Sequence, residues 1–114
     1  MKNGLIVSED GTQRWYLNGW LHRLDGPAVL KANGTQEWWV NGQPHREDGP
    51  SVIGANGYKE WRFEGKLHRT DGPAYIEANG YQEWWIHGAL REAPPGPPPP
   101  PFNYEAWNLD PLAL

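Results

Sequence analysis

The sequence predicts an all-β fold, an antiparallel β-meander or β-solenoid of 23-residue hairpin repeats with a Pro-rich extended C-terminal tail. Fourteen glycines and twelve prolines punctuate the 114 residues. Asn-Gly pairs, the strongest short hairpin signal, recur between segments of alternating apolar and polar residues. Apolar residues nowhere follow the 3.6-residue period of a helix, so we expect strands and tight turns throughout.

The repeats can be aligned without a gap. "LHRLDGPAVLKANGTQEWWVNG" begins at Leu21, "PHREDGPSVIGANGYKEWRFEG" at Pro44 and "LHRTDGPAYIEANGYQEWWIHG" at Leu67. The half-copy "EDGTQRWYLNG" precedes them, and the pattern fails after Gly88. We therefore expect a repeat domain over residues 1–92, with a half repeat at 5–19 and full repeats at 20–42, 43–65 and 66–88.

Each full repeat is expected to contain two strands and two turns. "PAVLKA" turns at Asn33-Gly34 into "TQEWWV", which turns again at Asn41-Gly42. We expect positive φ at both residues of each Asn-Gly pair. Asp25-Gly26-Pro27 forms the remaining corner, and its proline stands at a strand start, where proline is tolerated. At least seven short antiparallel strands follow for residues 5–86.

The histidine, arginine and aspartate in the "HRxDGP" segment resemble a catalytic or metal-binding cluster. Because the cluster recurs with its turn in every full repeat, we interpret it as a scaffold. Each imidazole is expected to donate to the aspartate or to a carbonyl of the next repeat. Equivalent residues would recur about every 9.5 Å, too far apart for three histidines to share one metal ion. We expect no cofactor and no metal, and a structural ladder formed by His22, Asp25, His45, Asp48, His68 and Asp71.

Strand alternation separates two rows of side chains. The first row contains Trp15, Trp38, Trp61 and Trp84, each followed two residues later by an aliphatic residue or Phe, and we expect it on the buried face. The second row contains Tyr16, Trp39, Arg62 and Trp85, with Glu37, Glu60 and Glu83 beside them. This second row is either core as well or an exposed aromatic surface that binds a partner.

Catalytic motifs do not stand out. The sequence contains no Gly-x-Ser-x-Gly, phosphate-binding loop or His-Glu-x-x-His, and its two serines, Ser8 and Ser51, lack a catalytic context. A carboxylate pair at a glycosidase-like separation is the remaining enzymatic alternative. We expect a protein that is not an enzyme.

Charge and cysteine content limit the classes of partner. The formal net charge is −4 with both signs interspersed, so we expect no nucleic acid and no membrane as partner. The absence of cysteine fits a reducing compartment, and we expect a cytoplasmic location. "MKNGLIVSEDG" has too short an apolar run for a signal peptide or a membrane span.

The composition changes after Glu92. Residues 93–101 are expected to be a polyproline linker, and residues 102–114 an apolar docking segment that contains Phe102, Tyr104 and Trp107. This segment could cap the stack, bind another protein, or exchange between copies to give a homo-oligomer. We expect residues 97–101 to lie on an aromatic row, with Trp85 and Tyr81 as first contacts and with Phe102 and Trp107 in apolar pockets.

The spacing Y-x-x-x-W-x-x-G at Tyr81, Trp85 and Gly88 resembles MORN-type repeats, and "HRxDGPA" is similar to a MORN-like variant of bacteriophage and large-virus proteins. This resemblance implies a viral accessory role in a host cytoplasm. The function expected is a non-catalytic protein–protein interaction module that binds or inhibits a host protein. The alternatives are a virion or assembly component, and a small carbohydrate-binding protein or hydrolase that uses the aromatic face.

Overall fold

The computed structural model describes residues 2–94, which form fourteen strands and no helix. The expectation of an all-β antiparallel fold is confirmed, as is that of at least seven strands within residues 5–86. The strands are β1 (Gly4–Val7), β2 (Gln13–Leu17), β3 (Trp20–Leu21), β4 (Val29–Leu30), β5 (Gln36–Glu37), β6 (Trp39–Val40), β7 (Gln43–Pro44), β8 (Val52–Ile53), β9 (Lys59–Glu60), β10 (Arg62–Phe63), β11 (Lys66–Leu67), β12 (Tyr75–Ile76), β13 (Gln82–Ile86) and β14 (Ala89–Arg91).

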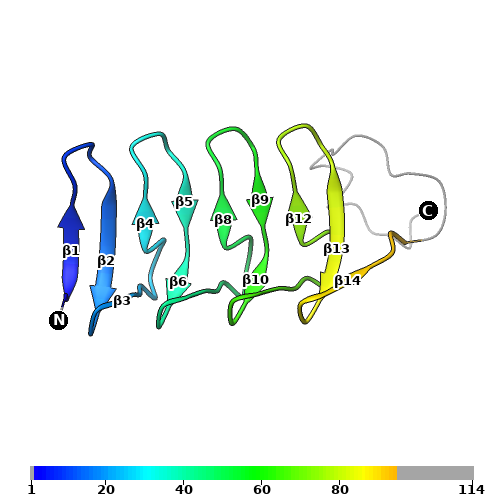
Figure 1. The fold of residues 1–114 in the computed structure, drawn as a ribbon, viewed down its shortest axis with the longest axis horizontal. Helices are drawn as coiled ribbons and strands as arrows, with labels where there is room; N and C mark the ends of the chain where they lie inside the picture. The colour runs from blue at the N-terminus through cyan, green and yellow to red at the C-terminus, as the bar shows by residue number, and fades with distance from the viewer. Residues whose placement is uncertain (1, 95–114) are drawn as a thin grey trace.

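The strands lie side by side in chain order, so the hairpins follow one another along the molecule (Figure 1). A ten-stranded sheet runs in the order β1-β2-β4-β5-β8-β9-β12-β13-β14, with β3 also paired to β2. The pairs β6-β7 and β10-β11 continue β5 and β9 after a single tryptophan. The turns therefore collect along two opposite margins of the sheet, an upper and a lower one in Figure 1.

The upper turns are three-residue loops, and here the expectation of two positive φ angles is wrong. The Lys31 N–H donates to the Thr35 carbonyl at 2.9 Å, and the Gly34 N–H donates to the Lys31 carbonyl at 2.9 Å. Only Gly34 has positive φ, at 95°, as in a type I turn that ends in a glycine bulge. The Asn33 side chain instead accepts the Thr35 N–H at 2.9 Å. The same side-chain bond recurs at Asp10, Asn56 and Asn79.

The lower turns are two-residue turns with positive φ at both positions, as predicted for Asn41-Gly42. The angles are 50° at Asn41 and 77° at Gly42, which identify a type I′ turn. Glu64 and His87 occupy the first turn position in the third and fourth copies, with φ of 50° and 48°. A left-handed conformation is unfavourable for such residues, so contacts with the beginning of the same repeat must stabilise these turns.

The "HRxDGP" segment is an excursion from an interrupted strand. The His22 N–H donates to the Trp15 carbonyl at 3.0 Å, and the Trp15 N–H donates to the Ala28 carbonyl at 2.8 Å. Both bonds lie on the same edge of β2, because the N–H and C=O of one residue point to the same side of a strand. The chain thus leaves the sheet after His22, forms a loop over one face and returns at Ala28.

Most of the buried residues are small and lie close to the points where the loops return. Ala28, Ser51 and Ala74, which occupy one position of the repeat, are each 0% exposed, and Val29 is 2% exposed. The Trp15 row, expected on the buried face, is only half-buried. The reason is that the strands of residues 2–94 form a single layer, which the loops cover in part.

Candidate binding face

We call the sheet surface opposite the loops the open face. The pairings Arg14 to Val29 and Val29 to Glu37 place these three side chains on the same surface. The residue two positions after Arg14, and after the equivalent glutamate of each full repeat, points to the same surface. Each unit therefore contributes two neighbouring side chains, which we call a rung; the rungs are Arg14/Tyr16, Glu37/Trp39, Glu60/Arg62 and Glu83/Trp85.

Hydrogen bonds within the rungs hold their side chains in place. The Trp39 indole Nε1–H donates to Glu37 Oε1 at 2.9 Å, and the Trp85 indole makes the same bond to Glu83 at 2.9 Å. Arg62 replaces the indole in the third rung, and its Nε donates to Glu60 Oε1 at 2.6 Å. The first rung differs, because Lys2 Nζ lies 5.0 Å from the centre of the Tyr16 ring.

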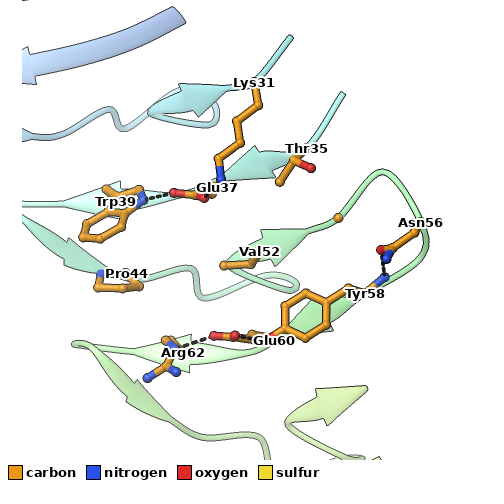
Figure 2. Close-up of a pocket in the computed structure, with 11 residues that line it drawn as sticks. Lys31, Thr35, Glu37, Trp39, Pro44, Val52, Asn56, Tyr58, Glu60 and Arg62 are labelled. Atoms are coloured by element: carbon orange, nitrogen blue, oxygen red, sulfur yellow. Dashed lines mark hydrogen bonds and ion pairs between the residues drawn. The ribbon is translucent and has the colours of Figure 1, made fainter. Parts of the chain in front are cut away.

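A groove of about 520 Å³ lies between the second and third rungs. Figure 2 shows Trp39 on one side, Arg62 and Tyr58 on the other, and Val52 between them. Gly54 stands where the other full repeats have Lys31 and Glu77, so no long side chain enters from this position. A Cβ on Gly54 would lie 2.9 Å from Asn56 Oδ1 and 3.0 Å from Tyr58 Cβ, so a larger residue at this position would require these two side chains to shift.

The charged groups of the groove are already paired. Lys31 Nζ lies 3.4 Å from Glu37 Oε2, and Glu60 receives hydrogen bonds from both Arg62 and Tyr58. Burial and the neighbouring Glu60 carboxylate raise the pKa of Tyr58, which keeps its hydroxyl protonated as a donor. The surfaces left for a ligand are therefore the Trp39 ring, Val52 and Pro44, with ion pairs at the rim.

Tyrosines fill the corresponding space between the third and fourth rungs. Tyr75 stands at the position of Val29 and Val52, and its ring lies 5.5 Å from that of Tyr58 in an edge contact. The Tyr81 ring lies 6.5 Å from Tyr75, and the Tyr81 hydroxyl donates to Glu83 at 2.9 Å. The larger residue at position 75 thus occupies the space that Val52 leaves open.

The structure brings only part of the predicted binding set into one site. Trp39 and Arg62 line the groove, whereas Tyr16 and Trp85 lie on the same face in the outer rungs and Tyr81 lies next to Glu83. Phe102, Tyr104 and Trp107 lie outside the described residues. The sequence interpretation missed Val52, Gly54 and Tyr58. Their role could have been noticed because the residues at these positions differ between the repeats. At position 54, for example, a glycine replaces the Lys31 and Glu77 of the other full repeats.

The covered face carries a recurring stack of tryptophan and arginine. The guanidinium carbon of Arg46 lies 3.8 Å from the centre of the Trp38 ring. Arg46 Nε donates to Asp48 Oδ1 at 3.0 Å, and Nη1 donates to the Pro50 carbonyl at 3.1 Å. The same three contacts recur at Arg23 and at Arg69. The guanidinium of Arg23 lowers the pKa of Asp25.

The histidines make a different hydrogen bond from the one expected. His22 Nδ1 accepts the backbone N–H of Asn41 at 3.0 Å, so the imidazole does not donate to Asp25 or to a carbonyl through this nitrogen. His45 accepts from Glu64, and His68 accepts from His87, both at 2.9 Å. The aspartate is paired with arginine instead. Each histidine therefore holds the lower type I′ turn at the end of its own repeat, including the turns that begin with Glu64 and His87.

Residues 2 and 3 make the equivalent contacts for the first lower turn. The Asn3 side chain accepts the Asn18 N–H at 2.8 Å, and the Lys2 carbonyl accepts the Gly19 N–H at 2.8 Å. In the next unit His22 and the Leu21 carbonyl play these two roles. An asparagine amide thus replaces an imidazole at the first turn.

The described part of the chain has neither a metal-binding cluster nor a membrane-spanning helix. No group of three or more His, Cys, Asp or Glu side chains in residues 2–94 is placed to hold a metal ion. No helix in this range is long and apolar enough to cross a membrane.

Comparison with known proteins did not identify a relative. No family model matches the chain, no curated protein matches it, and no solved structure matches it.

Proposed function

We propose that this chain is a non-catalytic binding module that takes up an extended segment of another protein in the groove between Trp39 and Arg62. The proposal includes a continuous β-solenoid of MORN-like repeats as the scaffold and, following the resemblance to viral "HRxDGPA" proteins, a host protein in the cytoplasm as the partner. The observation that carries it is the groove itself, an open space of about 520 Å³ on the face free of loops.

The chemistry of the groove supports a protein segment as the ligand. The carboxylates of Glu37 and Glu60 are paired within the chain, so the groove offers little net charge for an ionic ligand. The ring of Trp39 and the side chain of Val52 offer apolar surface between polar rims, as in many peptide-binding grooves. The rungs hold their side chains by internal hydrogen bonds, which lowers the entropy cost of binding.

A carbohydrate is the second candidate. The Trp39 ring lies beside the Glu37 carboxylate and the Lys31 ammonium, an arrangement that can stack against a sugar and bond its hydroxyls. The paired state of both polar groups makes this the weaker interpretation.

The test uses a displayed library of random peptides, selected against the intact chain, together with a glycan array. Val52→Tyr copies the residue at position 75 and should fill the groove without a new packing problem, and Trp39→Ala removes one wall. We expect selected peptides to lose at least tenfold in affinity for both variants, while the control Gln43→Ala binds normally. Peptides that bind Val52→Tyr as well as the original chain would contradict the proposal. Glycans that bind in a Val52-dependent way would assign the groove to a sugar.

A further inference from the structure

The first strand, β1, has one edge that no strand within residues 2–94 covers. It lies at the end of the row of strands in Figure 1, and its only partner in this range is β2. Leu5 stands opposite Trp15 in that pair. Both backbone groups of Trp15 face away from β1, because its N–H donates to the Ala28 carbonyl and its carbonyl accepts the His22 N–H. Leu5 and Trp15 therefore form a non-hydrogen-bonded pair, and the N–H and C=O of Leu5 point outward from the sheet.

The backbone groups of Val7 point outward as well. The next residue, Ser8, donates its N–H to the Thr12 carbonyl at 2.9 Å, so the backbone groups of Ser8 face β2. Successive residues of a strand direct these groups to opposite edges, which places those of Val7 on the same outer edge as those of Leu5. Two N–H donors and two C=O acceptors on this edge are thus unused within the described part of the chain.

The side chains of β1 are apolar and more exposed than their equivalents in the repeats. Ile6 occupies the position of Val29, because each is paired with the equivalent residue of the long strand that follows it. Val29 has a strand on both sides and is 2% exposed, whereas Ile6 has a strand on one side and is 40% exposed. Leu5 and Val7 are 48% and 57% exposed. A further strand along this edge would remove apolar surface from water.

The two ends of the row differ in how their edges are protected. Natural edge strands commonly contain a charged residue or a proline, which discourages pairing with another chain. At the far end, β14 and the residues after it include Arg91, Glu92 and Pro94. β1 has the sequence "GLIV", with neither a charge nor a proline. The edge of β1 is therefore the better suited of the two to pair with another strand.

We propose that two copies of the chain associate through β1, with the two strands antiparallel and related by a two-fold axis. Leu5 of each copy pairs with Val7 of the other, and each such pair uses both of its N–H groups and both of its C=O groups. Ile6 then lies opposite Ile6 of the second copy on the open face. The edge is complementary to itself, because every pair in this register is apolar.

Charges beyond the two ends of β1 favour the same arrangement. The antiparallel register brings Lys2 of one copy to the turn that contains Glu9 and Asp10 of the second copy. The two-fold axis repeats this contact at the other end of the interface. A parallel pair would instead place each lysine next to the other lysine and each acidic turn next to the other acidic turn. Electrostatic complementarity thus selects the antiparallel orientation.

Pairing of β1 with β14 of another copy fits less well. That contact would leave a free end on each copy and continue as an open filament, whereas the two-fold contact closes after two copies. The two-fold axis of an antiparallel strand pair is perpendicular to the sheet, so the open faces of both copies point the same way. If the function proposed above holds, the dimer presents two binding grooves on one side, which increases avidity for a partner with repeated segments.

Sedimentation of the intact chain over a range of concentrations tests the association. The interface contains few residues, so we expect a weak dimer whose share rises between about 5 and about 500 µM. The apparent mass should approach twice that of one chain and then stop rising. Val7→Lys should abolish the dimer without disturbing the pairing with β2, because the backbone groups of Val7 do not face β2.

A charge swap tests the register independently of folding. Lys2→Glu and Glu9→Lys each bring like charges together at both ends, so each variant alone should dimerise about fivefold more weakly. An equal mixture of the two variants restores opposite charges at both ends and should dimerise as well as the original chain. Lys66→Glu is the matched control, since it makes the same change of charge at an exposed position away from β1 and should have no effect.

Three results would overturn the inference. One is a chain that stays monomeric over the whole range; protection of the Leu5 N–H from hydrogen exchange in that monomer would show that another segment of the same chain covers the edge. The second is growth beyond two copies, which would assign the contact to head-to-tail pairing. The third is a mixture of Lys2→Glu and Glu9→Lys that dimerises no better than either variant alone.

Discussion

The two faces of the sheet differ in which residue types they accept at equivalent positions of the same four units. The covered-face row contains tryptophan at positions 15, 38, 61 and 84, whereas the open-face row contains Tyr16, Trp39, Arg62 and Trp85. On the covered face a planar guanidinium lies on a planar ring in three units, and this stack needs the shape of both partners. On the open face the recurring contact is an N–H donated to a glutamate, which an indole or a guanidinium supplies equally well.

This difference separates scaffold from recognition within one chain. A position that must fill a stack cannot vary between units, whereas a position that must only supply a donor can. The open face varies in this way: Arg62, Gly54 and Val52 line a groove, whereas tyrosines fill the corresponding space in the next unit. The comparison predicts that substitutions on the covered face reduce stability and that substitutions on the open face reduce binding.

Replacement of the adjacent tryptophans should give the largest contrast. Trp38→Ala removes the ring beneath Arg46, and we expect it to lower the free energy of unfolding by about 3 kcal/mol. Trp39→Ala, on the open face, should cost about 1 kcal/mol, because it loses mainly the bond to Glu37. Urea denaturation of both variants measures the difference. Equal losses would show that the two faces do not differ in their structural role.

Arg46→Ala should show the next largest effect, about 2 kcal/mol of unfolding free energy. The change removes the contact with Trp38 and the bond to the Pro50 carbonyl, both made by a side chain that is mostly covered. Arg46→Lys should recover less than half of the loss, because an ammonium cannot stack and bond in two directions at once. The matched open-face control is Arg62→Trp, which copies the second and fourth rungs and should leave stability within about 0.5 kcal/mol. A destabilised Arg62→Trp chain would argue against a donor-only requirement.

His45→Ala should lower the free energy of unfolding by about 1 kcal/mol, through loss of the acceptor for the Glu64 N–H. His45 also contacts the Phe63 ring at 4.6 Å, so the effect should equal or exceed that of His22→Ala. His45→Asn should retain part of the stability, since the Asn3 amide accepts the equivalent N–H of the first turn. Thermal denaturation of the three variants provides the measurement. A His45→Asn chain no more stable than His45→Ala would show that the turn needs the ring rather than the acceptor.

The smallest expected effect is a change in how the free energy of unfolding depends on pH under acidic conditions. Arg23 lowers the pKa of Asp25 below its usual value of 3.8, so this carboxylate contributes stability that is complete above about pH 4 and is lost as pH falls through the lowered pKa. Asp25→Asn should therefore flatten the fall of stability below pH 4, as followed by urea denaturation at several pH values. The side chain is 86% exposed, so solvent weakens the contribution. An unchanged acid profile would mean that the pair adds no stability.

The sequence was enough to predict the order of the strands, but it was not enough to predict the hydrogen-bond partners of the side chains. The Asn-Gly pairs and the 23-residue period predicted the hairpins because turn chemistry is local. The partner of His22 was missed because it is the backbone of Asn41, a donor that every residue except proline offers. The upper turns were assigned the wrong φ pattern because Asn33 can bond a backbone N–H with its side chain instead of adopting positive φ.

The binding groove was only partly predictable for a related reason. Alternation placed Trp39 and Arg62 on one face, but the groove depends on what is small at Val52 and Gly54. An absent side chain gives no motif, and it becomes visible only when Tyr75 and Glu77 show how the same space is filled in the next unit.

The lower-turn contacts have a consequence for how the chain folds. Within residues 2–94, the hydrogen bonds connect residues at most 21 positions apart, as between Gly42 and Leu21. Short sequence separations lower the loop-closure entropy of each step, so any pair of neighbouring units can act as a nucleus from which order spreads in both directions. A 23-residue unit could then be inserted or removed without rebuilding distant contacts, and the length of such a protein could change in whole units.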